Sequence, residues 1–120
     1  MIYFVLLVLI AISLSSCKYS KEEILYPVTT CDTTNIKFSG RVASVFALNC
    51  LMCHGNNVVP PSGGIRLQDY ADVKIYIDRS LGAMSHLPGF KPMPLGSTET
   101  IDACQIKVVR IWKDAGAPNN

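Results

Sequence analysis

The sequence predicts a small all-α domain, and three observations lead to this fold class. Three segments, 40–49, 69–81 and 102–115, carry apolar residues at the three- and four-residue spacing of an amphipathic helix. No two segments alternate apolar and polar residues as paired strands do, and only 65–67 has a short extended character. The chain has 120 residues, which is enough for one domain and too few for two.

Charge and composition exclude several classes of protein. Charged residues make up 17% of the chain and the net charge is +2. No basic stripe with interleaved aromatic residues is present, so we expect no nucleic-acid partner. The content of Leu, Ile and Val is that of a folded domain rather than of a disordered chain.

The first predicted helix, 40–49, has Ser39 as its expected N-cap. Its inward face is formed by residues at spacings of three and four: Val42, Val45, Phe46 and Asn49. The second helix begins at Asp69, a favourable capping residue, and directs four side chains inward: Tyr70, Val73, Ile77 and Leu81.

The third helix has the clearest boundaries. Asp102 with Gln105 forms a capping-box-like start, and Gly116 followed by Pro118 ends the segment. The inward positions within it are Ile106, Val109 and Trp112.

The N-terminus has the features of an export signal. Residues 1–16 are too short an apolar run to span a bilayer and fit the apolar core of a signal peptide. The run ends in Leu14-Ser15-Ser16-Cys17, which resembles the lipobox of bacterial lipoproteins and implies a lipid on Cys17. Residues 17–30 then form a flexible tether and 31–120 the domain. The alternatives are an ordinary signal peptide, with Cys17 as a spare thiol, and a retained helical anchor.

A C-x-x-C-H motif at residues 50–54 is the strongest chemical signal in the chain. Cys50 and Cys53 have the spacing that lets two thiols on one helical turn add to the two vinyl groups of one haem. His54, the next residue, then lies beneath the iron as the proximal ligand. A zinc site, with further ligands from Cys31, Cys104 or His86, and a thiol redox pair are the alternatives.

Cysteine usage also bears on Cys31 and Cys104. The chain has five cysteines, and this pair remains once Cys17 carries lipid and Cys50 and Cys53 carry haem. An exported protein favours a disulfide, which would contribute on the order of 4 kcal/mol by closing a long loop. The alternative is two free buried thiols.

The segment 87–94 supplies a candidate for the second iron ligand. Met93 lies between two prolines, which stiffen the backbone that presents its weakly binding thioether. Met84 and His86 are the alternative ligands, whereas Met52, the variable residue of the motif, points away. Arg66 and Tyr70 are candidates for contact with a haem propionate, the alternative being an ordinary surface or packing role for each.

These motifs together resemble the class I cytochromes c, and more narrowly the small monohaem lipoprotein cytochromes of some Gram-negative bacteria. The likeness covers residues 31–120. It rests on the C-x-x-C-H motif, Gly63-Gly64-Ile65-x-Leu67, Met93-Pro94 and the ending from Trp112 to Pro118. It implies a small cytochrome c-like fold with three main helices wrapped around one covalently bound haem c.

The resemblance also implies particular contacts. The first and last helices would cross, bringing Phe46 near Trp112, and Leu67 would pack on the haem. A backbone carbonyl near 60–62 would accept the Nδ1 proton of His54, which orients the imidazole. Cys31 paired with Cys104 would be a feature of the subgroup.

The expected function is one-electron transfer at the cell envelope. A haem with His54 and Met93 on its two faces has no position open for substrate, so we expect a carrier and not an enzyme, although it could serve as a relay subunit of an oxidoreductase complex. The expected partners are redox proteins of the envelope, met transiently, and the membrane reached through the lipid. The expected location is the periplasm-facing envelope or the outer membrane of a Gram-negative bacterium. The alternatives are a haem peroxidase or ligand sensor with a labile Met93, and a zinc-binding structural module.

Overall fold

The computed structural model describes residues 30–120, except for the side chain of Pro61. Within this range, Cys31–Asn120 form one compact unit. The predicted signal peptide 1–16, the lipidation residue Cys17 and all but the last residue of the tether 17–30 lie outside the described residues. No helix in the described part of the chain is both long and apolar enough to cross a membrane.

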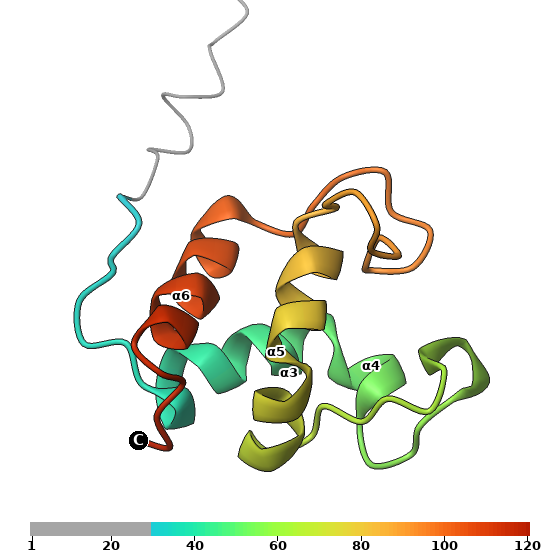
Figure 1. Ribbon diagram of the computed structural model, residues 1–120, viewed down its shortest axis with the longest axis horizontal. Helices are drawn as coiled ribbons and strands as arrows, with labels where there is room; N and C mark the ends of the chain where they lie inside the picture. Colours follow the sequence, from blue (N-terminus) through green and yellow to red (C-terminus); the bar gives the residue numbers. More distant parts are fainter. Residues whose placement is uncertain (1–29) are drawn as a thin grey trace, which may run out of the picture. The chain divides into compact units, whose positions relative to one another are not determined.

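The described residues form helices joined by irregular segments, without a strand, which confirms the all-α class. Figure 1 shows α5 and α6 side by side, both crossing the run formed by the first helical elements. In chain order the elements are the π-helical turn η1 (Phe38–Val42), α3 (Ala43–Asn49), α4 (Leu51–His54), the 3₁₀ turn η2 (Pro60–Ser62), α5 (Tyr70–Met84) and α6 (Ala103–Asp114).

The first helical segment begins earlier than predicted and is capped differently. Its N-cap is Lys37 in an extended conformation, so the prediction of Ser39 as N-cap is wrong. The free amide groups are bound from the other end of the chain. Asn120 accepts from the amide of Phe38 with its side-chain Oδ1 (2.8 Å) and from that of Ser39 with its carbonyl oxygen (2.9 Å). A partner so distant in sequence leaves no local signal.

The two longer helices begin where the sequence predicts. The Asp69 carboxylate accepts from the amide of Asp72 (3.1 Å), and the Asp72 carboxylate accepts from that of Asp69 (3.4 Å), which completes a capping box. Asp102 accepts from the amide of Gln105 (3.0 Å). α5 continues to Met84, almost one turn past the predicted end.

The core forms where α6 packs on η1. The Phe38 ring lies 5.5 Å from that of Trp112 and 5.2 Å, edge-on, from that of Tyr70. Phe46 is buried in the same core as Trp112, and the ring packed against that of Trp112 is Phe38, which the sequence analysis did not name. The helix crossing falls on the π turn, about two turns ahead of Phe46. The predicted inward residues Val42, Val45, Val73, Ile77, Leu81 and Val109 are buried.

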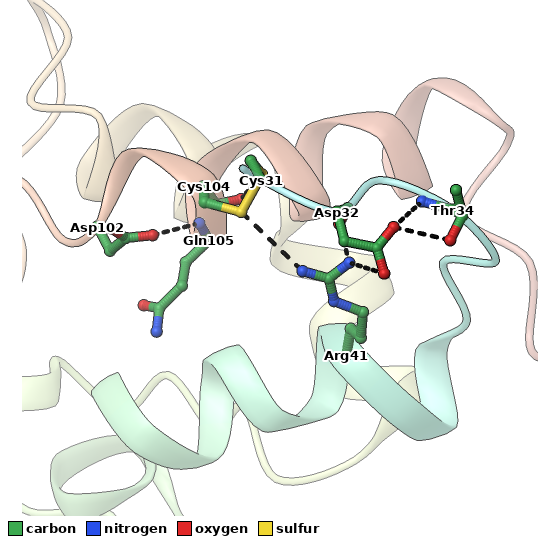
Figure 2. Close-up of a disulfide and its surroundings, with 7 residues drawn as sticks. All are labelled: Cys31, Asp32, Thr34, Arg41, Asp102, Cys104 and Gln105. Carbon is green, nitrogen blue, oxygen red and sulfur yellow. Dashed lines mark hydrogen bonds and ion pairs between the residues drawn. A yellow bond between two sulfur atoms is a disulfide. The ribbon is translucent and has the colours of Figure 1, made fainter. Parts of the chain in front are cut away.

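A disulfide joins Cys31 to Cys104, with the two Cα atoms 5.4 Å apart. Figure 2 shows Arg41 between this bond and Asp32, its guanidinium 4.0 Å from the Cys104 sulfur. Hydrogen bonds from the Thr34 side chain and amide lower the pKa of Asp32, and Arg41 acts in the same direction. The segment that precedes η1 is therefore fixed to the first turn of α6 by a covalent bond.

Candidate cofactor site

A cavity of about 830 Å³ lies between α4, α5 and the loop 85–97 that follows α5. Its wall includes residues from four parts of the chain: the C-x-x-C-H motif, the segment 62–67, α5 and the loop. The predicted site residues on this wall are Cys50, Cys53, His54, Leu67, Met84 and Met93. The fold therefore brings together residues that the sequence separates by forty positions.

Cys50 is the N-cap of α4, and Cys53 lies within its single turn. The carbonyl of Cys50 accepts from the amides of Cys53 (3.1 Å) and His54 (2.9 Å), so the motif forms one helical turn. Both thiols are free and half-buried. Burial raises the pKa of Cys50 to about 11, so this group is a neutral thiol at physiological pH.

His54 is held by a backbone carbonyl close to the stretch in which one was expected. Its Nδ1 lies 2.8 Å from the carbonyl oxygen of Ile65. A carbonyl only accepts, so Nδ1 carries the proton in this contact, and Nε2 of the neutral ring is left as a metal ligand. The acceptor lies just after the stretch 60–62, because the carbonyls of Pro60 and Ser62 accept from the amides of Gly63 and Ile65.

A second hydrogen bond fixes the segment 65–67 to the motif. The Leu67 amide donates to the carbonyl of His54 (2.7 Å), and the Leu67 side chain is buried on the cavity wall. Gly55, the residue after His54, is required for a different contact, because a Cβ there would lie 2.6 Å from the carbonyl oxygen of Leu51. The sequence analysis passed over Gly55, for which the signal was a glycine directly after the motif.

Met93 reaches the cavity from a loop fixed to the end of α5. Its amide donates to the carbonyl of Ala83 (3.1 Å). The Phe90 ring lies directly on Gly82, where a Cβ would come within 2.5 Å of the ring. Neither Phe90 nor Gly82 was singled out from the sequence, and their contact shows only in three dimensions.

The alternative ligands are placed differently from one another. Met84 lies on the cavity wall, but it is only 4% exposed and belongs to the hydrophobic core. His86 is not on the wall, and its Nε2 lies 3.2 Å from the carbonyl oxygen of Met93. Met52 is 92% exposed at the rim, as expected for the variable motif residue.

The two candidates for a propionate contact, Arg66 and Tyr70, are bound to other groups, in agreement with ordinary surface and packing roles. Arg66 is paired with Asp69 (3.1 Å) and Asp72 (3.0 Å), and the Tyr70 hydroxyl donates to the carbonyl of Ala117 (2.9 Å). Neither residue lines the cavity. The cationic side chains on the wall are instead Arg79 of α5 and Lys91 of the loop, for which the sequence held no distinguishing signal.

The extra ligands that a zinc site requires are engaged elsewhere. Cys31 and Cys104 are bonded to each other, and His86 contacts Met93. Within residues 30–120, no three His, Cys, Asp or Glu side chains gather in a group that could hold a metal ion.

The cavity thus combines two free thiols, an imidazole with one nitrogen available, thioethers and an apolar wall. This donor set suits a large, flat, largely apolar cofactor that is attached through sulfur and ligated by nitrogen. Comparison of the chain with models of protein families, with curated proteins and with solved structures finds no match.

Proposed function

We propose that this protein is an electron carrier with one c-type haem, bound covalently through Cys50 and Cys53 in the cavity described above. The observation that carries the proposal is that both free thiols, His54 and Met93 share one cavity wall. The volume of about 830 Å³ lies within the range of about 300–1,000 Å³ that is common for ligand and cofactor pockets.

His54 and Met93 are the proposed axial ligands. His54 has its Nδ1 proton on Ile65, so the imidazole is already oriented with Nε2 available. Met93 is favoured over Met84 because core packing accounts for Met84, whereas Met93 lies outside the core on a fixed loop. A haem held in this way gains and loses one electron at an iron with both axial positions filled.

The same assignment extends to the fold. We take the all-α arrangement as a small cytochrome c-like fold, in which the end of the first helical run and α5 border the haem and α6 packs behind them. The packing of α6 on η1 and the two bonds between the motif and 65–67 support this assignment. Leu67, buried on the wall, would pack against the haem face.

The proposed location is the envelope of a Gram-negative bacterium, facing the periplasm or in the outer membrane, with a lipid on Cys17 as the anchor. The disulfide supports an oxidising compartment outside the cytoplasm. Exposed apolar side chains at the cavity rim, Leu48, Met52 and Leu95, provide a surface for redox proteins. Such contacts are typically small, under about 1,200 Å² in total.

The enzyme alternative, a peroxidase or ligand sensor with a labile Met93, has less support. A peroxidase needs an acid–base side chain on the open face of the haem. On the described cavity wall the histidine is His54, which serves as the proximal ligand in any haem assignment, and the carboxylate is Asp78, which is paired with Lys113 (2.5 Å). The zinc alternative lacks free further ligands, as described above.

The test is maturation of the full chain in a host that attaches haem c. We expect a red protein with the spectrum of a reduced c-type haem and a mass increase of one haem. The double variant Cys50→Ser/Cys53→Ser should lose covalent haem, whereas Met52→Ala, a change of an exposed residue within the same motif, should keep it. A colourless wild type, with Cys50 and Cys53 still open to alkylation, would contradict the proposal.

A further inference from the structure

We infer that His86 is a positioning residue that holds Met93 toward the cavity through a hydrogen bond from its Nε2 to the carbonyl oxygen of Met93. The inference rests on the proposed function, because holding Met93 in place matters only if Met93 is a ligand of the haem iron. His86 is half-buried, and the two atoms are 3.2 Å apart. The Met93 carbonyl only accepts, so Nε2 is the donor.

This bond completes the fixation of the Met93 backbone. The amide of Met93 donates to the carbonyl of Ala83 (3.1 Å), while its carbonyl accepts from His86. Both polar backbone groups of the proposed ligand are thus bound to the end of α5 or to the residue two positions after it. Direct bonds to both groups restrict rotation of the peptide planes on each side of the side chain.

The backbone at His86 explains how its ring reaches a residue seven positions later. His86 has a φ of 51°, in the left-handed region that residues other than glycine seldom adopt. Its amide donates to the carbonyl of Ala83 (3.2 Å), the same acceptor that Met93 uses. A reversal of the chain directly after α5 therefore accompanies the approach of the imidazole to Met93.

The contact matters because a thioether is a weak, neutral ligand for iron. Any freedom in the loop lets water or an added ligand compete for the position. The packing of Phe90 on Gly82 does not involve His86 and should keep the loop folded when the hydrogen bond is removed. The expected effect of removal is thus a larger population of molecules with Met93 dissociated, in a protein that still folds.

The experiment compares the haem-loaded wild type with His86→Leu and His86→Gln. Leucine removes the donor, whereas the amide nitrogen of glutamine restores an N–H donor at a similar reach. The readouts are the far-red absorption band of sulfur-ligated ferric haem and the rate of cyanide binding to the ferric protein. Loss of one hydrogen bond worth about 1 kcal/mol should speed cyanide binding about fivefold in His86→Leu, at 1.4 kcal/mol per tenfold. His86→Gln should stay close to the wild type.

Equal cyanide rates in His86→Leu and the wild type would overturn the inference. Equal acceleration in both variants would also overturn it, since the donor would then not be what matters. A coloured wild type without the far-red band would refute Met93 ligation and the inference with it, leaving covalent haem attachment intact. A colourless wild type would instead refute the proposed function itself.

Discussion

The carbonyl oxygen of Ile65 lies 2.8 Å from Nδ1 of His54 and fixes the orientation of the imidazole. The chain delivers this carbonyl by reversing through Gly63 (φ 62°) and Gly64 (φ 78°), directly after the 3₁₀ turn. Both glycines lie in the left-handed region, where a Cβ is unfavourable. The orientation of His54 therefore depends on the backbone conformation of Gly63 and Gly64.

Replacement of Gly64 by alanine tests whether this turn requires a glycine. A Cβ at Gly64 meets nothing within 4 Å, so the penalty is conformational strain of about 1–2 kcal/mol in the free energy of unfolding. The measurement is equilibrium denaturation in guanidinium chloride. Gly40→Ala is the matched control, because Gly40 lies in a helical turn with open space around it. There alanine should stabilise by about 0.5–1 kcal/mol. Equal effects at the two positions would contradict the prediction.

The ligand assignment predicts opposite behaviour for two methionines on the same wall. Met93→Ala should keep the covalent haem and lose the far-red ferric band, because it removes the sulfur ligand and leaves the core residues in place. Met84→Ala should keep the band and lose about 2–5 kcal/mol of stability, because it leaves a cavity in the core. Absorption spectra and thermal unfolding measure the two effects. Loss of the band in Met84→Ala alone would reverse the assignment.

The sequence was sufficient for features that depend on neighbouring residues. Asp69 and Asp102 cap their helices with side chains that reach three residues along, so the composition of one turn predicts them. The C-x-x-C-H turn is local in the same sense. The candidate ligand Met93 was found because its two flanking prolines show in the sequence.

What the sequence missed depends on contacts between distant segments. Asn120 binds the start of η1, and Phe38 places its ring beside that of Trp112, a contact that the sequence analysis did not name. Which carbonyl near 60–62 binds His54 also stayed open: the turn uses those of Pro60 and Ser62 for itself, and Ile65 provides the acceptor. None of these contacts leaves a local pattern in the sequence, because each depends on which distant segments the fold brings together.

The contact of Gly82 with Phe90 predicts a result that runs against helix propensity. Gly82→Ala inside α5 would ordinarily stabilise the helix. Here the new Cβ would come within 2.5 Å of the Phe90 ring, so we expect a loss of about 1–3 kcal/mol from overpacking. Phe90→Ala in the same chain should make Gly82→Ala harmless. A double-mutant cycle measured by denaturation checks the coupling. Additive single and double variants would contradict the packing described.

The disulfide predicts a stability change that is separate from the cofactor. Cys31→Ser/Cys104→Ser removes a bond that spans 73 positions, and the chain-entropy model gives a loss of up to about 4 kcal/mol. Neither residue lines the cavity, so the variant should keep haem and its visible spectrum unchanged. Thermal unfolding and absorption spectra test the two parts. A changed spectrum at full folding would show that the bond also shapes the haem site.

The buried thiol of Cys50 predicts a pH effect that haem attachment should abolish. In the chain prepared without haem, burial raises the pKa of Cys50 from 9.0 to about 11. The folded state holds this proton more tightly than the unfolded state does. The free energy of unfolding therefore keeps its full value below pH 9 and falls as the pH rises toward 11. Denaturation curves across this window should fall more steeply for the haem-free wild type than for haem-free Cys50→Ser. The haem-loaded protein should lack this component as well, because a thioether does not titrate. A haem-loaded protein with the same Cys50-dependent loss would show that this sulfur carries no haem.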